Sequence, residues 1–92
     1  MLYNVVVTTQ RDTMTVASII REIRGKRTLR EFASMLDVTH AAVDQWERGM
    51  TNPERGRVAE WLEADSSEIR LLGVKVFAAL YGDMLQDLVG TA

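Results

Sequence analysis

Residues 40–48 form a short stretch that is rich in polar side chains, which can donate hydrogen bonds to a partner or accept them. If the stretch is helical, Val43 and Trp46 lie three residues apart on one face and anchor it to a core. A helix that is anchored on one side and polar on the other is suited to present its outer face to a partner. That outer face carries four polar side chains and one small apolar one, namely His40, Asp44, Gln45, Arg48 and Ala41.

The composition excludes several other kinds of chemistry. The 92 residues contain no cysteine, which removes disulfides, thiolate catalysis and cysteine-ligated zinc together. His40 is the only histidine, so no cluster of imidazoles can hold a metal ion. The sequence has no Ser-His-Asp motif, no phosphate-binding glycine loop and no nucleophile elbow. We therefore expect a protein that is not an enzyme and that uses neither a cofactor nor a metal.

The charges of the chain are unevenly distributed. The chain has 11 Lys and Arg residues, 13 Asp and Glu residues and a formal net charge of -2, so bulk charge does not favour a polyanion. Residues 16–57, however, carry eight basic and six acidic residues, whereas residues 58–92 carry two basic and six acidic residues. The basic excess therefore coincides with the polar stretch. Because no segment resembles an export signal or a membrane span, we expect a soluble, cytoplasmic protein.

Capping residues and glycines divide the middle of the chain into short helices at about 16–24, 29–36 and 40–48. Threonine satisfies free N–H groups at a helix N-terminus, and glycine suits the residue that follows the last turn. Glu31 stands three residues after Thr28, as in a capping box. The candidate caps are Thr15 or Thr13, then Thr28 and Thr39, and the closing glycines are Gly25 and Gly49.

Two further helices are predicted after residue 51. Asn52 is the expected cap of the fourth helix and Pro53 its first residue, because the fixed φ of proline suits that position. Ser66 or Ser67 is expected to cap the last helix, with Glu68 near its positive end. The pattern as a whole predicts an all-α fold of five helices.

The last helix carries two apolar stripes, where a surface helix of a small domain needs only one. Two stripes require burial on two sides, and a second copy of the chain is the favoured cover, because large exposed apolar patches mark interfaces. The alternative is that Gly82 breaks the helix and that the tail folds back over the same core. One stripe is Ile69, Leu72, Val76, Leu80, Met84 and Leu88, and the other, the candidate dimer interface, is Leu71, Val74, Phe77, Tyr81 and Leu85.

The first residues of the chain differ in character from the rest. Residues 2–9 are rich in β-branched and aromatic side chains, which favour a strand. A single strand needs a partner, either its copy in a second subunit or another segment. Residues 1–14 are therefore interpreted as an arm with a possible short strand, with a loosely ordered tail or an extension ahead of Met14 as the alternatives.

Residues 28–53 read TLREFASMLDVTHAAVDQWERGMTNP, and this segment resembles the helix-turn-helix of the lambda-repressor-like family, of the Cro and xenobiotic-response-element type. The resemblance covers about residues 16–65. Two positions depart from the family pattern: Asp37 stands where the turn usually has glycine, and Leu29 stands where relatives often have a phosphate-contacting glutamine. The matching features are Ala33, Leu36, Val38, Thr39, Val43, the run 46–49 and the pair 52–53.

The resemblance implies that helix 40–48 lies in the major groove of double-stranded DNA. Gln45 can then pair with adenine, Ala41 can contact a thymine methyl group, and His40 can donate to guanine or reach a phosphate. Asp44 can accept from cytosine N4, although a solvated or salt-bridged Asp44 is the favoured alternative. The base-contacting residues implied in this way are His40, Ala41, Asp44 and Gln45.

The resemblance also implies a set of contacts to the DNA backbone, which supply position and affinity rather than sequence information. In the family, the residue at Glu47 pairs with an arginine of the first helix, for which Arg24 and Arg21 are the candidates here. The expected phosphate-contacting residues are Thr28, Arg30, Thr39, Arg48, Lys26 and Arg27, with Arg55 as a further candidate.

The sequence thus predicts three parts: the arm at 1–14, a helix-turn-helix core at 15–65 and a C-terminal dimerisation helix at 66–92. The predicted function is that of a homodimeric, sequence-specific repressor of bacterial or phage origin. Its two reading helices would lie about 34 Å apart on a near-palindromic operator. The alternative is an antitoxin, which would bind a toxin protein and regulate its own operon by the same DNA-binding surface.

Overall fold

The computed structural model describes the backbone of residues 15–90 and the side chains of residues 15–82. The predicted strand at 2–9 lies outside the described residues. Within residues 15–90 the chain forms five helices and no strand, which confirms the all-α fold. The helices are α2 (Val16–Arg24), α3 (Leu29–Leu36), α4 (His40–Glu47), α5 (Arg55–Leu62) and α6 (Ser67–Gly90).

Three threonines begin the first three helices, as predicted. The hydroxyl oxygens of Thr15, Thr28 and Thr39 each accept a hydrogen bond from the backbone N–H three residues ahead, at 3.1 Å in every case. Glu31 returns the contact by accepting from the N–H of Thr28 at 2.9 Å, which completes the capping box. At the start of α6 the Ser66 hydroxyl accepts from the backbone N–H of residue 69 at 3.3 Å.

The start of α5 differs from the prediction. Asn52 does not cap the helix and Pro53 is not its first residue, because α5 begins at Arg55 with Glu54 as its N-cap residue. Glu54 has extended dihedrals (φ -68°, ψ 154°) and its side chain makes no capping hydrogen bond. Pro53 is buried in the loop ahead of the helix, and α5 begins two residues later.

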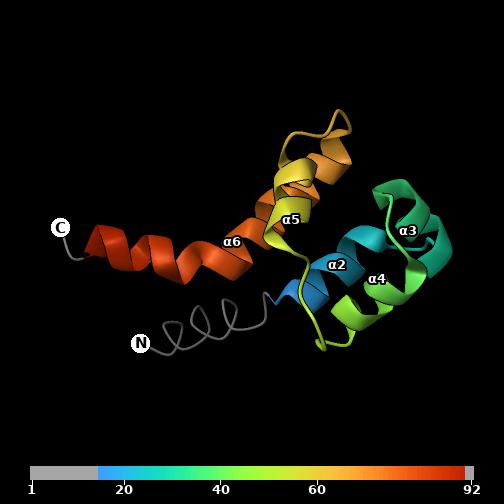
Figure 1. Cartoon of the computed structure of the whole chain (residues 1–92), viewed down its shortest axis with the longest axis horizontal. Helices are drawn as coiled ribbons and strands as arrows, with labels where there is room; N and C mark the ends of the chain where they lie inside the picture. Colours follow the sequence, from blue (N-terminus) through green and yellow to red (C-terminus); the bar gives the residue numbers. More distant parts are fainter. Residues whose placement is uncertain (1–14, 91–92) are drawn as a thin grey trace, which may run out of the picture.

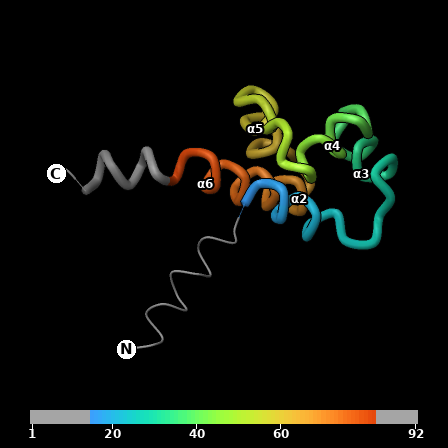
Figure 2. The backbone as a smooth tube through the Cα atoms, turned by 90° about the horizontal axis from the view of Figure 1, so that it is seen from below, coloured from blue at the N-terminus to red at the C-terminus, as the bar shows by residue number. Residues whose placement is uncertain are grey.

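Helix α2 lies between two pairs of helices, as Figures 1 and 2 show. It packs against α4 on one side and α6 on the other, while α3 packs on α4 and α5 packs on α6. Every helix contributes at least one side chain that is no more than 1% exposed, namely Ile20, Phe32, Val43, Val58 and Leu72. The helices therefore share a single core.

Two tryptophans join α4 to α5 inside this core. The rings of Trp46 and Trp61 meet edge to face, with centroids 5.6 Å apart and an interplanar angle of 77°. Both side chains are buried, as predicted from their helical positions. Edge-to-face aromatic pairs add to the free energy gained from burial, so this contact helps to fix α4 against the body.

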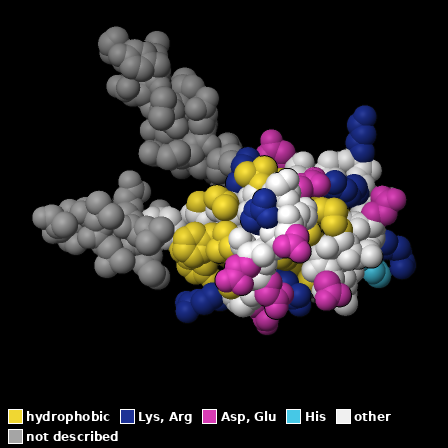
Figure 3. Space-filling view, turned by 90° about the horizontal axis from the view of Figure 1, so that it is seen from above, with side chains coloured by type: hydrophobic (Ala, Val, Ile, Leu, Met, Phe, Trp, Pro, Cys, Tyr) yellow, Lys and Arg dark blue, Asp and Glu magenta, His cyan; other side chains and the backbone are white. Residues whose placement is uncertain are grey.

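Helix α6 continues through Gly82, so the alternative of a helix that breaks there is wrong. Leu72 and Val76 of one stripe are fully buried, and Ile69 and Leu80 pack against the core as partly buried residues. Figure 3 shows hydrophobic side chains gathered on the surface beside the last described side chains. The exposed large hydrophobic residues of α6 are Leu71, Val74 and Phe77, at 48%, 54% and 36%.

Gly73 allows α6 to approach α5 closely. A Cβ atom at this position would lie 2.9 Å from the backbone nitrogen of Leu62 and 3.0 Å from Cβ of Trp61. Neither atom belongs to the flexible end of a side chain, so the two helices would have to move apart. Gly82 lies in the same helix, but a Cβ atom there would meet nothing within 4 Å.

We therefore expect Gly73→Ala and Gly82→Ala to have opposite effects on the free energy of unfolding. The first variant should lose about 1–3 kcal/mol through overpacking at the α5–α6 contact. The second should gain up to about 1 kcal/mol, because alanine has the higher helix propensity. Urea unfolding followed by circular dichroism measures both, and equal effects of the two substitutions would contradict the close contact at Gly73.

Candidate nucleic-acid interface

The turn between α3 and α4 is closed by a residue in the left-handed conformation. Asp37 has φ 60° and ψ 46°, and its N–H donates to the carbonyl of Ser34 at 3.2 Å. The N–H of Val38 donates to the carbonyl of Ala33 at 3.0 Å, so the pair forms a Schellman motif. Val38 packs against the core. Aspartate thus occupies the place where glycine is usual, because it tolerates this conformation better than most residues.

The other end of α4 is closed in the same way. Gly49 has a φ of 74°, and its N–H donates to the carbonyl of Trp46 at 3.1 Å. The next N–H, of Met50, donates to the carbonyl of Gln45 at 2.9 Å. With Thr39 at its start and this motif at its end, α4 is held at both termini by local hydrogen bonds.

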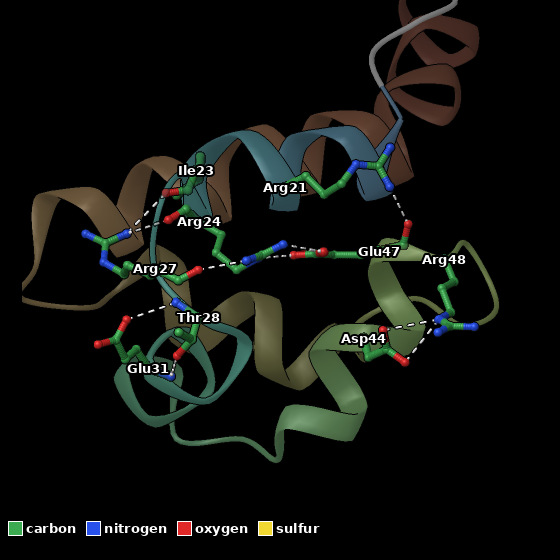
Figure 4. A network of polar contacts seen from close by, with 9 residues as sticks. All are labelled: Arg21, Ile23, Arg24, Arg27, Thr28, Glu31, Asp44, Glu47 and Arg48. Atoms are coloured by element: carbon green, nitrogen blue, oxygen red, sulfur yellow. Dashed lines mark hydrogen bonds and ion pairs between the residues drawn. The ribbon is translucent and has the colours of Figure 1, made fainter.

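Two arginines of α2 hold the C-terminal end of α4 (Figure 4). Arg24 binds the carboxylate of Glu47 with two nitrogens, Nε at 2.6 Å and Nη2 at 3.0 Å. Arg21 donates through Nη1 to the backbone carbonyl of Glu47 at 2.6 Å. The predicted pairing with the first helix is therefore made by Arg24, while Arg21 serves the free carbonyl at the helix end. Both contacts orient α4 relative to α2.

The Arg24–Glu47 pair is largely removed from water. The side chain of Glu47 is 9% exposed and that of Arg24 is 23% exposed. The hydrogen bond from Arg24 to Glu47 raises the pKa of Arg24 above its ordinary value, against the opposing effect of burial. The carboxylate that Arg24 binds belongs to Glu47, the one buried charged residue of α4.

The outward face of α4 brings together the residues expected to contact bases. His40, Ala41 and Gln45 are exposed, and Asp44 is partly exposed at 40% of its side chain. Arg48 follows at the C-cap and pairs with Asp44, with Nε 3.1 Å from Oδ2. The salt-bridged alternative considered for Asp44 is thus present in the structure. The opposite face is buried through Val43 and Trp46, so the outer face is free to meet a partner.

The residues expected to contact phosphates fall into two groups. Thr28, Thr39, Lys26 and Arg30 are exposed, and a capping hydroxyl that accepts from the backbone still has its own proton to donate. Arg27 is different, because its guanidinium binds Glu68 at 2.7 Å and backbone carbonyls of α2. Arg27 therefore connects the start of α6 to the end of α2.

Two arginines have roles that no sequence pattern indicates. Arg27 and Glu68 are 41 positions apart, and no local pattern links them. The contact from Arg21 to the end of α4 spans 26 positions and involves a backbone carbonyl, which carries no sequence signal. Arg55, a further phosphate candidate, lies with its guanidinium 5.8 Å from the ring centroid of Tyr81.

The two capped helices, the tight turn between them and the exposed face of α4 define a helix-turn-helix domain of the DNA-binding class. A family model described as Helix-turn-helix (HTH_3) matches residues 19–72, more than half of the chain. The protein belongs to this lambda-repressor-like helix-turn-helix family, whose members are DNA-binding transcription regulators and generally not enzymes. No curated protein sequence and no solved structure matches the chain.

The described residues lack two further features. None of the helices among them combines the length and apolar character that crossing a membrane requires. The same residues contain no group of three or more His, Cys, Asp or Glu side chains placed to hold a metal ion.

Removal of either partner of the Arg24–Glu47 pair should destabilise the domain. Arg24→Met leaves the buried carboxylate of Glu47 without its ion-pair partner, whereas Glu47→Met leaves Arg24 with a backbone carbonyl and some water. Each substitution should cost about 2–3 kcal/mol of unfolding free energy, less than the loss of a partner in a fully buried pair. The double variant should cost less than the sum of the two. Arg57→Met is the control, since the exposed Arg57–Glu60 pair contributes less than about 1 kcal/mol. Additive losses in chemical denaturation would contradict this coupling.

Proposed function

We propose that the protein is a homodimeric, sequence-specific repressor of bacterial or phage origin that places α4 in the major groove of its operator. The observation that carries the proposal is the exposed polar face of α4, held rigidly by Trp46 and by the Arg24–Glu47 pair behind it. A reading helix with so little freedom of orientation loses little entropy on binding. Such a regulator would act in the cytoplasm, where the DNA lies, and would repress by occupying the promoter.

The side chains of this face match the hydrogen-bonding groups of base edges. The carboxamide of Gln45 can both donate to N7 and accept from N6 of adenine, and the methyl group of Ala41 can contact thymine. His40, at the first position of α4, can donate to guanine or to a phosphate. Asp44 can accept from cytosine N4. These four contacts are the proposed sequence readout.

Contacts to the DNA backbone would come from the two helix starts and from basic residues near them. Thr28 and Thr39 offer a hydroxyl donor together with the N–H groups of a first helical turn. Lys26, Arg30 and Arg48 supply positive charge, and all three are exposed. The acidic excess of the chain lies after residue 57, so the basic residues are concentrated where the phosphates would lie.

The exposed stripe of α6 is the proposed dimer interface, with a second copy of the chain as its occupant. Leu71, Val74 and Phe77 are exposed, and the Phe77 ring packs on Tyr81 with centroids 5.1 Å apart. A two-fold interface brings the same patch of each subunit together, so an uncharged apolar patch is complementary to itself. The side chain of Leu85, also assigned to this interface, lies outside the described side chains.

The antitoxin alternative uses the same α6 surface for a different protein. A toxin bound there would leave α4 free, so both functions would include binding to DNA. Purification of the full chain from its own host with a second protein in equal amount would favour the antitoxin over the simple repressor.

The base-reading role of Gln45 is tested by Gln45→Ala. Selection of bound duplexes from a random pool supplies the operator, and titration of that operator measures affinity. The variant should lose about 1–3 kcal/mol of binding free energy for each subunit and its preference at one base pair of each half-site. Ser67→Ala, on the surface at the start of α6, is the control and should bind as the original protein does. A variant that keeps both affinity and base preference would show that α4 is not the reading helix.

The dimer is tested by placing a charge in the α6 stripe. Val74→Glu should shift the chain to a monomer, because a two-fold interface would bring the two added carboxylates together without partners. Ala79→Glu adds the same charge to an exposed position of α6 outside the stripe, and should leave the dimer intact. Sedimentation velocity at micromolar concentration distinguishes the two states. An original chain that is already monomeric there would refute the α6 dimer.

A further inference from the structure

The outer face of α4 contains an ion pair between Asp44 and Arg48, whose role the proposed function leaves unexplained. Arg48 donates through Nε to Oδ1 of Asp44 at 3.2 Å, and the same nitrogen lies 3.1 Å from Oδ2 in an ion pair (Figure 4). The two residues are four positions apart in the order, acid before base, that favours contact along a helix. Asp44 is also the one acidic residue on the face that is expected to meet DNA, where phosphates repel a carboxylate.

This pair contrasts with the Arg24–Glu47 pair behind the helix. The side chains of Arg48 and Asp44 are 68% and 40% exposed, so water competes with the contact and its energy is small. A weak exposed pair contributes little to folding and is easily broken. The carboxylate of Asp44 nevertheless offsets part of the charge of Arg48 while the two side chains are paired.

We propose that Asp44 is a specificity-determining residue that lowers binding to non-cognate DNA by competing with phosphate for Arg48. The inference rests on the proposed function, since it requires α4 to face the major groove. On a non-cognate site Asp44 meets no matching base donor and stays paired with Arg48, so a phosphate must compete with Asp44 for the guanidinium. This competition weakens the electrostatic attraction that supplies non-specific affinity.

At the cognate site the amino group of a cytosine replaces Arg48 as the partner of Asp44. Cytosine N4 presents a donor in the major groove, and a carboxylate is its matching acceptor. The guanidinium of Arg48 is then free to bind a phosphate, so one correct base yields two contacts. Discrimination of this kind acts mainly by penalising the wrong sites, which is an efficient source of specificity.

The test compares Asp44→Asn with Glu63→Gln in the full chain, with a random-sequence duplex as the probe. Each substitution removes one negative charge, but Glu63 follows α5 at the end of that helix remote from the α4–α5 loop. We expect Asp44→Asn to bind the random duplex about tenfold more tightly. The slope of log K against log salt should steepen by about 2 for the dimer, the value for one additional phosphate contact in each subunit. Glu63→Gln should change affinity by less than about twofold.

The same pair of substitutions in an Arg48→Gln background isolates the competition. If Asp44 acts through Arg48, the gain from Asp44→Asn should be much smaller in the Arg48→Gln background than in the original protein. In addition, duplexes selected by Asp44→Asn should lose a cytosine that the original protein selects.

The outcomes separate the inference from the function on which it rests. Equal effects of Asp44→Asn and Glu63→Gln on a protein that binds DNA would overturn the inference and leave the proposed function intact. An undiminished gain in the Arg48→Gln background would do the same. An original protein that binds neither random nor selected duplexes would overturn both. Circular dichroism of each variant confirms that it is folded.

Discussion

The orientation of α4 depends on one buried carboxylate. Glu47 ends the helix inside the protein, and a charge in that position is tolerable only if it is paired and hydrogen-bonded. Arg24 meets this requirement with two nitrogens, and Arg21 binds the carbonyl of the same residue. Since both arginines belong to α2, the relative position of α2 and α4 is constrained at a point next to the outer face of α4. Rotation of α4 would separate Glu47 from Arg24 and leave a buried charge without its partner. The pair therefore fixes the direction of the exposed polar face.

The remaining helices support this arrangement through the shared core. Trp46 and Trp61 fill the space between α4 and α5, and Gly73 lets α6 approach the end of α5. Leu72 and Val76 of α6 are fully buried, so the first turns of α6 complete the core. The same helix has an opposite apolar face that this core does not cover. A single element therefore closes the domain and carries the proposed dimer surface.

The distribution of charge along the chain matters more for DNA binding than the net charge. A net charge of -2 disfavours general attraction to DNA, although the residues around α4 are basic. The two ion pairs of α4 have opposite relations to water: Arg24–Glu47 is largely buried and orients the helix, whereas Asp44–Arg48 is exposed and can exchange partners. The proposed reading of DNA thus rests on hydrogen bonds to bases more than on the number of positive charges.

The sequence by itself determined the helices, the turn and the outer face of α4, because these depend on contacts within a few positions. A threonine cap reaches three residues ahead, and the left-handed Asp37 serves its own helix end. Only the tertiary structure decided which arginine pairs with Glu47, that Arg27 binds Glu68, and that α5 begins at Arg55. Those partners lie 23 and 41 positions apart. They meet only when the helices pack, so burial and packing geometry select among side chains that the sequence alone leaves equivalent.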